Sequence, residues 1–230
     1  MKKLSTDEQK HNAAAAAVAF VENKMMVGLG TGSTVEFALR LLGKRIKSRL
    51  KITGVPSSIA TARAAKRCGI PLVRDWGEFK KLDLTIDGAD EVDPELNLIK
   101  GGGGALTREK IIATRSDRVI IMVNEKKLVP QLGKFRVPVE VLPFGWRSTA
   151  EVLRSLGSRV ALRAQAGKPF HTDNGNFIVD CSFGKITEPL ELLQQIKSIV
   201  GVVEVGLFVG IADLVIAGKH DGGTEEKWGV

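Results

Sequence analysis

The pattern of hydrophobic and polar positions in the first two-thirds of the chain alternates between two periods. Apolar residues three and four positions apart predict helices, and short apolar runs between them predict strands. The predicted helices are Ser5–Asn23, Ser33–Ser48, Ser58–Cys68 and Ala105–Arg115. The predicted strands are Met25–Leu29, Ile52–Val55, Ile70–Val73, Leu82–Ile86 and Arg118–Val123. This alternation predicts an α/β domain of the Rossmann-like kind, in which a parallel sheet carries helices on both faces.

From about Gly133 the order of elements changes to strand, helix, strand, strand, helix, strand. The elements are Arg136–Leu142, Trp146–Leu156, Arg159–Arg163, Phe177–Phe183, Pro189–Ile199 and Val202–Leu207. This order is typical of a ferredoxin-like α+β domain. Pro138 lies inside its first strand, which favours an edge position. A last strand, Ala212–Ala217, could rejoin the first sheet. We therefore expect a larger domain of residues 1–132 and 209–230, with residues 133–208 inserted as a smaller one.

Composition narrows the class of protein. The chain has 230 residues, of which 43% are hydrophobic and 26% are charged, as in ordinary globular proteins. Its two cysteines, Cys68 and Cys181, are too few for a disulfide framework and indicate a reducing compartment. Asp7 and Glu8 stand where a signal peptide would begin its apolar run, and Ala13–Phe20 is too short to span a bilayer. We expect a cytoplasmic protein that does not enter a membrane.

The net charge of +8 favours an anionic partner, either a phosphorylated metabolite or a nucleic acid. The densest basic run, Lys44–Lys51, ends a predicted helix, where cations complement the helix dipole in any case. No zinc-finger, RNP or low-complexity basic pattern accompanies this run. We therefore expect no nucleic-acid partner, although charge alone leaves the anion unidentified.

A glycine-rich loop, Gly28–Thr34, joins the first strand to the second helix. Glycines let the backbone approach an anion, and a helix N-terminus offers unpaired N–H groups. A dinucleotide fingerprint would need glycine at position 33, which holds serine, and an acid after the second strand, where Pro56 stands. The loop therefore predicts a site for a single phosphate, the alternative being a tight turn with a Ser/Thr cap.

Four acids occur within the seven residues Asp87–Asp93, directly after a predicted strand. Ligands of open α/β sheets lie outside the carboxyl ends of the strands, so this turn predicts a cation site or a polar substrate site. Ala89 and the lack of a nearby histidine count against a metal. An acidic surface turn is the alternative.

The segment Lys100–Lys110 carries the clearest chemical signal. Four consecutive glycines imply a backbone that must approach another group closely, and Lys100 places a cation before them. Glu109 falls in the first turns of the next helix, where the dipole stabilises a carboxylate that could remove a proton next to a carbonyl. A solvated helix residue is the alternative for Glu109, and only its place behind Lys100 and the glycines outweighs it.

Taken together, these segments resemble the type A ribose-5-phosphate isomerase family, which has a GTGST loop, a DGADE turn and a KGGG segment followed by REK. All three occur here in that order. The resemblance continues through Leu132–Phe135, Pro138–Val141, Thr172–Asn176 and Gly201–Val203, so it covers nearly the whole chain.

The resemblance implies interconversion of D-ribose 5-phosphate and D-ribulose 5-phosphate in the pentose phosphate pathway, through an enediol and without metal or cofactor. It implies that Glu109 transfers the proton and that Asp87 and Lys100 assist ring opening and stabilise the enediolate. It also implies a homodimer or homotetramer. The substrate-binding residues implied are Thr31, Gly32, Ser33, Thr34, Asp87, Gly88, Ala89, Asp90, Lys100, Gly101, Gly102, Gly103 and Lys127. The neighbouring Lys126 is the alternative to Lys127.

Two other functions are alternative hypotheses. Related folds serve as sugar-phosphate-sensing modules of bacterial repressors, but no helix-turn-helix is expected before residue 1, and a sensor has no need of Glu109. An enzyme similar to coenzyme A transferases would use a glutamate as nucleophile, which a covalent adduct with acyl-CoA would reveal.

Overall fold

The computed structural model describes residues 3–75, 77, 79 and 81–229. The chain divides into two compact units. The first comprises Met1–Ala89, Arg108–Leu128 and Ile211–Val230, and the second comprises Asp90–Thr107 and Val129–Gly210. The sequence pattern assigned residues 90–107 to the larger domain. They join the second unit because their short strands pair with Leu207–Phe208 rather than with the main sheet.

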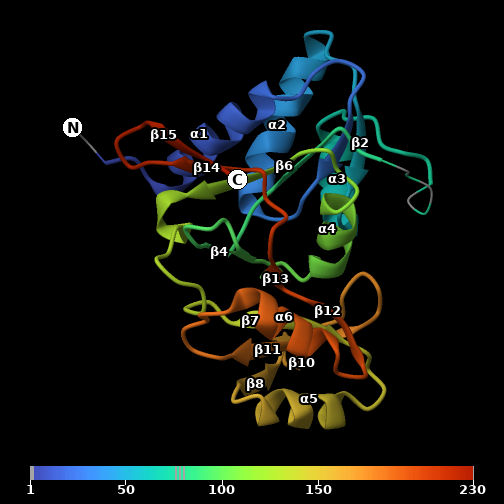
Figure 1. The fold of residues 1–230 in the computed structure, drawn as a ribbon. Coiled ribbons are helices and arrows are strands. Elements are labelled where there is room, and N and C mark those ends of the chain that lie inside the picture. The colour runs from blue at the N-terminus through green and yellow to red at the C-terminus, as the bar shows by residue number, and fades with distance from the viewer. Residues whose placement is uncertain (1–2, 76, 78, 80, 230) are drawn as a thin grey trace. The chain divides into compact units, whose positions relative to one another are not determined.

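The first unit is built on a six-stranded sheet with the order β15-β14-β6-β3-β1-β2. Figure 1 labels four of these strands, β15, β14, β6 and β2. Its strands are β1 (Met26–Leu29), β2 (Thr53–Pro56), β3 (Leu84–Asp87), β6 (Val119–Asn124), β14 (Leu214–Gly218) and β15 (Thr224–Trp228). Only β15 is antiparallel to its neighbour. β14 pairs with β6 in parallel, so the predicted return of the chain to the first sheet is confirmed.

Helices cover both faces of this sheet, as predicted. They are α1 (Thr6–Ala19), α2 (Ser33–Lys47), α3 (Ile59–Arg67) and α4 (Leu106–Ala113), with a short 3₁₀ turn η1 (Glu125–Lys127) after β6. On one face, the fully buried alanines of α1 pack with side chains such as Ile86 and Ile120. On the other face, Ile112 of α4 packs with Val55 and Leu82. Gly28 lies beneath α4, where a Cβ would come 2.5 Å from the Ile112 Cγ2 atom, so only glycine fits.

The second unit contains a four-stranded antiparallel sheet with the order β12-β7-β11-β8. Its elements are β7 (Val137–Val141), α5 (Trp146–Ser155), β8 (Arg159–Leu162), β11 (Phe177–Ser182), α6 (Pro189–Lys197) and β12 (Val202–Val205). If the four strands are numbered along the chain, their order across the sheet is fourth, first, third, second. This is the split β-α-β arrangement of a ferredoxin-like domain. Val139 of β7 packs with Leu153 of α5 and Ile196 of α6 in the core.

Smaller strands complete the second unit, and the sequence pattern had not indicated most of them. β4 (Glu91–Val92), β5 (Leu98–Ile99) and β13 (Leu207–Phe208) form a three-stranded sheet, and β9 (Ala164–Gln165) pairs with β10 (Lys168–Pro169). The predicted strand Val202–Leu207 is therefore two strands, because the chain leaves β7 at Gly206 and continues beside β5. The predicted strand Ile70–Val73 is wrong, since only Leu72 forms a bridge, with Gly54.

The predicted edge position of the Pro138 strand is also wrong, because β7 lies between β12 and β11. The Pro138 carbonyl accepts a hydrogen bond from the Gly206 N–H at 2.7 Å. The nitrogen and oxygen of one strand residue point to the same side, so the missing N–H of Pro138 faces Gly206, just past the end of β12. A central strand tolerates this proline because the Gly206 carbonyl accepts its hydrogen bond from the Lys100 N–H at 2.8 Å instead.

Candidate active site

The loop after β1 is tied to the acid that ends β3. β1 and β3 are adjacent parallel strands, so their carboxyl ends meet at one edge of the sheet. The buried Asp87 side chain accepts hydrogen bonds from the N–H groups of Thr31 at 3.2 Å and Gly88 at 2.7 Å. A Cβ on Gly30 would lie 2.0 Å from the Asp87 Oδ1 atom. The glycine loop therefore allows the backbone to lie directly against this carboxylate.

The Thr31 hydroxyl contacts other hydroxyl groups of the first unit. It lies 2.7 Å from the Ser57 hydroxyl and 2.9 Å from that of Ser58, and it is 3.1 Å from Thr61. These contacts hold the loop to the start of α3. Gly32 (φ +130°) is the N-cap of α2 and provides no side-chain cap, so the first turn of α2 has N–H groups for an anion. Ser33 is exposed beside it and Thr34 is half-buried.

A cavity of about 380 Å³ lies next to this loop, between α2 and α3. Thr31, Gly32 and Ser33 contribute to its lining, together with Arg63 and Arg67 of α3. Both arginines are exposed and lie one helical turn apart, so they face the same side of α3. Their positive charges favour an anion at the loop. The sequence pattern did not single them out, because arginines four residues apart on a surface helix are common.

Lys127 and Glu109 lie at the same carboxyl edge of the first unit's sheet. Lys127 is in η1, directly after β6, and is half-buried, whereas Lys126 is exposed. Glu109 lies in the first turn of α4. Because α4 leads into β6 as a crossover helix, its N-terminus lies at the carboxyl edge of the strands. Glu109 is 3% exposed, and the helix dipole stabilises a carboxylate at this position.

The second unit positions Asp90, Lys100 and the glycines after it. The Asp90 Oδ2 atom accepts a hydrogen bond from the Gly102 N–H at 2.8 Å. Lys100 is 3% exposed, and its Nζ atom lies 5.4 Å from the centre of the Phe208 ring, a cation–π distance. Gly101 has a φ of +99°, which side chains rarely adopt. The predicted site residues thus form two groups, with Asp90, Lys100 and Gly101–Gly103 in the second unit.

A buried carboxylate that sequence reasoning missed anchors the start of α4. Glu140 of β7 is 0% exposed, and its side chain accepts four side-chain hydrogen bonds. The donors are the Thr107 hydroxyl at 2.5 Å, the Thr172 hydroxyl at 2.9 Å, and the amides of Asn174 at 3.1 Å and Asn176 at 2.8 Å. Thr107 is two residues before Glu109 in α4. Glu140 thereby holds Thr107, the second residue of α4, in place.

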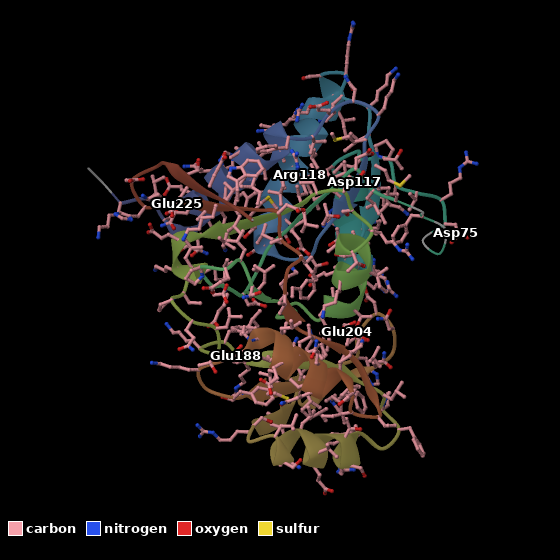
Figure 2. The ribbon with its side chains drawn as sticks, in the orientation of Figure 1. Asp75, Asp117, Arg118, Glu188, Glu204 and Glu225 are labelled. Carbon is pink, nitrogen blue, oxygen red and sulfur yellow. The ribbon has the colours of Figure 1, made fainter. Side chains whose placement is uncertain are left out.

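Three other titratable groups were not among the predicted site residues. Asp117, labelled in Figure 2, is 2.6 Å from the Lys81 Nζ atom and precedes β6, so it lies at the opposite edge of the sheet. Burial raises the pKa of Asp93, partly offset by hydrogen bonds from Asn97. Burial also raises the pKa of the Cys181 thiol to about 12, so this thiol stays protonated at neutral pH.

Two absences apply to the described part of the chain. Within residues 3–75, 77, 79 and 81–229, no three His, Cys, Asp or Glu side chains are grouped so as to hold a metal ion. Among the helices of the same residues, none combines the length and the apolar character needed to cross a bilayer.

An open α/β sheet with a glycine loop, a buried carboxylate and a lysine at one carboxyl edge is an arrangement typical of α/β proteins that bind a small ligand at that edge. The model of the ribose 5-phosphate isomerase A (phosphoriboisomerase A) family matches residues 53–222. The chain belongs to this family.

Individual relatives agree with this assignment over almost their whole length. The chain is 53% identical over 224 residues to ribose-5-phosphate isomerase A of Gloeobacter violaceus, covering 96% of each chain. It is 50% identical over 216 residues to ribose-5-phosphate isomerase A 1 of Oceanobacillus iheyensis, covering 94% of this chain and 96% of the relative.

Solved structures give the same result. A D-ribose-5-phosphate isomerase in complex with phospho-erythronic acid superimposes with a TM-score of 0.94 at 41% identity, covering 98% of this chain and all of that one (100%). The ribose 5-phosphate isomerase A of Methanocaldococcus jannaschii has a TM-score of 0.92 at 39% identity, covering 97% of this chain and 100% of that chain. The predicted fold class is confirmed by these matches.

Proposed function

We propose that this protein interconverts D-ribose 5-phosphate and D-ribulose 5-phosphate through an enediol, as a step of the pentose phosphate pathway. The observation that carries the proposal is membership of the isomerase family over nearly the whole chain. The related structure that holds phospho-erythronic acid supports it, because that ligand is a phosphorylated polyhydroxy acid. Its planar carboxylate also has the two-oxygen arrangement of an enediolate.

In this proposal Glu109 is the base that moves the proton. In the open-chain aldose, the Glu109 carboxylate removes hydrogen from C2, and the electron pair forms the C1–C2 double bond while the C1 carbonyl oxygen becomes an oxyanion. That oxyanion gains a proton, the C2 hydroxyl loses one, and C1 receives the proton held by Glu109, which gives the ketose. The burial of Glu109 supports the assignment, since water is kept away from the carboxylate.

Asp87 and Lys100 are proposed to assist. Asp87 would help to open the furanose ring, and the Lys100 ammonium would stabilise the developing enediolate oxygen. Both side chains are only 3% exposed, which strengthens their electrostatic effect relative to water. These two residues and Glu109 constitute the proposed catalytic group.

The remaining residues are proposed to bind the substrate. The phosphate would lie at the N-terminus of α2, on the loop Thr31–Thr34, where Gly32 leaves the first-turn N–H groups without a side-chain cap. Lys127 would meet an anionic group of the substrate, and its half-buried position favours it over the exposed Lys126. Gly88, Ala89, Asp90 and Gly101–Gly103 would contact the sugar hydroxyls.

The test is an isomerase assay with ribose 5-phosphate in the presence of EDTA. We expect turnover to persist, because the proposed proton transfer uses side chains alone. Loss of turnover in EDTA, restored by one divalent ion, would reject the metal-free mechanism. Tight binding of ribose 5-phosphate without turnover would indicate a sensor instead, and a covalent adduct after incubation with acyl-CoA would indicate a transferase.

We also propose that the protein is a cytoplasmic homodimer or homotetramer. The proposal rests on membership of the isomerase family and not on an interface in the structure. Light scattering coupled to size-exclusion chromatography gives the assembly directly, and a mass of one chain, 24.8 kDa, would contradict this proposal.

A further inference from the structure

Arg163 lies directly after β8 in the second unit, against the glycine loop that follows Lys100. Its Nη1 atom donates hydrogen bonds to the carbonyl of Gly101 at 2.8 Å and to that of Gly102 at 3.1 Å. Its other edge pairs with Asp180 of β11, with Nε to Oδ2 at 3.0 Å and Nη2 to Oδ1 at 2.5 Å. The two side chains are 15% and 18% exposed. A guanidinium held at both edges in this way has one fixed orientation.

The two carbonyl contacts determine where the neighbouring N–H groups point. In a trans peptide, the carbonyl of one residue and the N–H of the next point in opposite directions, and the described chain has no cis peptide bond. Because the Gly101 carbonyl faces Arg163, the Gly102 N–H faces away, and it donates to the Asp90 carboxylate at 2.8 Å. By the same reasoning, the Gly103 N–H also points away from the guanidinium.

We propose that Arg163 is a positioning residue for the isomerisation. It sets the peptide planes of the glycine loop, and through the Gly102 N–H it sets the orientation of the Asp90 carboxylate. This inference rests on the proposed function, in which Asp90 and Gly101–Gly103 bind the sugar.

A glycine loop needs such support from outside. Gly101–Gly103 have no side chains with which to anchor themselves, and glycine loses more conformational freedom on ordering than any other residue. The Phe170 ring adds a second support. It lies 6.0 Å from the Arg163 Cζ atom, and a Cβ on Gly104 would come within 2.5 Å of it. Together, Arg163 and Phe170 hold the two ends of the loop.

The kinetic test compares Arg163→Met with Arg159→Met. Arg159 is an exposed arginine at the start of β8, the strand that Arg163 follows, so its replacement controls for lost charge and lost surface packing. We expect Arg163→Met to lower kcat about 10²-fold, the effect of misplacing reacting groups by roughly an ångström. KM should stay within about threefold, because the proposed phosphate loop Thr31–Thr34 is unchanged. Arg159→Met should leave both constants as in the wild type.

Two further measurements separate positioning from a loss of folded protein. In Arg163→Gly, added guanidinium ion should restore part of kcat, whereas sodium chloride at equal ionic strength should not. Hydrogen exchange of the Gly102 amide should become faster in Arg163→Met, because the peptide is no longer fixed against Asp90. This exchange does not depend on turnover.

The outcomes decide between the possibilities. A folded Arg163→Met enzyme whose kcat is within about threefold of wild type would overturn the inference. If Arg163→Met does not fold, Arg163→Lys and Asp180→Asn take its place, and wild-type kcat in both would overturn it equally. If the wild-type protein does not isomerise ribose 5-phosphate but Gly102 exchange still rises in Arg163→Met, the proposed function has failed and the structural link has not.

Discussion

Replacing Glu140 tests how much the buried hydrogen-bond network contributes to stability. The carboxylate is fully buried and accepts bonds from Thr107, Thr172, Asn174 and Asn176. In Glu140→Leu all four donors lose their acceptor at a site of nearly unchanged volume. In Glu140→Gln the three bonds to Oε1 can persist, and the new amide can donate to the Thr107 hydroxyl. The two variants should therefore differ widely.

The burial of each donor sets the size of the effect. Thr172 is buried, and stranding its hydroxyl costs about 1–3 kcal/mol. Thr107 and Asn176 are half-buried and should each cost about 1 kcal/mol, while the exposed Asn174 amide can turn to water. Glu140→Leu should thus lower the free energy of unfolding by about 3–5 kcal/mol. Glu140→Gln, which loses only the charge, should cost about 1–2 kcal/mol.

The assay is urea unfolding followed by circular dichroism, with Tm as a second readout. For a chain of this size, 1 kcal/mol corresponds to about 2–4 °C, so Glu140→Leu should melt roughly 6–20 °C below the wild type. Glu151→Gln, an exposed glutamate on α5, is the matched control and should stay within about 0.5 kcal/mol of the wild type. If Glu140→Leu were as stable as this control, the network would contribute nothing and the reasoning would be refuted.

Three further predictions concern the site and its pH dependence. Glu109→Gln should stay folded but lose about two orders of magnitude in turnover and in exchange of the substrate's C2 hydrogen with deuterated water. Near-wild-type values of both rates would refute the role of Glu109 as the base. Lys100→Ala should lower kcat and Lys127→Ala should raise KM, whereas unchanged kcat/KM in both variants would contradict the proposed site. A hydrogen bond from His220 lowers the pKa of Glu125 below its ordinary 4.5. The contact therefore stabilises the protein above that pH, and the contribution is lost as the pH falls through the lowered pKa. In His220→Ala, carbon NMR should show the Glu125 pKa returning toward 4.5, and an unchanged value would disprove the attribution.

Local patterns were sufficient for most of the fold. The hydrophobic period of α2 depends on residues close in sequence. The same is true of the N-cap of α3, where the Ser58 hydroxyl accepts a hydrogen bond from the Thr61 N–H. The features of the fold that the hydrophobic pattern did not predict depend on partners far along the chain. Strands of two residues, such as β4 and β5, are too short to show a period. The central position of β7 follows from where β12 ends, which Pro138 alone cannot reveal.

The same distinction applies to the candidate site. Glu109 and Lys100 stand inside glycine-rich motifs, so their chemistry is visible in the order of residues. Arg163 and Glu140 stand in ordinary strand sequences, and their contacts with Gly101 and Thr107 span 62 and 33 positions. No local signal marks such residues, because only the folded chain brings the partners together.

The parallel pairing of β6 with β14 also affects how the protein folds during its synthesis. β6 ends at Asn124 and β14 begins at Leu214, so the ribosome must translate the whole second unit before β6 gains this neighbour. At about 5–20 residues per second, that interval lasts several seconds or more. During this time the apolar strand VIIMVN has an open edge, which is the kind of segment that chaperones protect and that aggregates when left uncovered. The nascent chain should therefore be most vulnerable in the interval between the synthesis of β6 and the synthesis of β14.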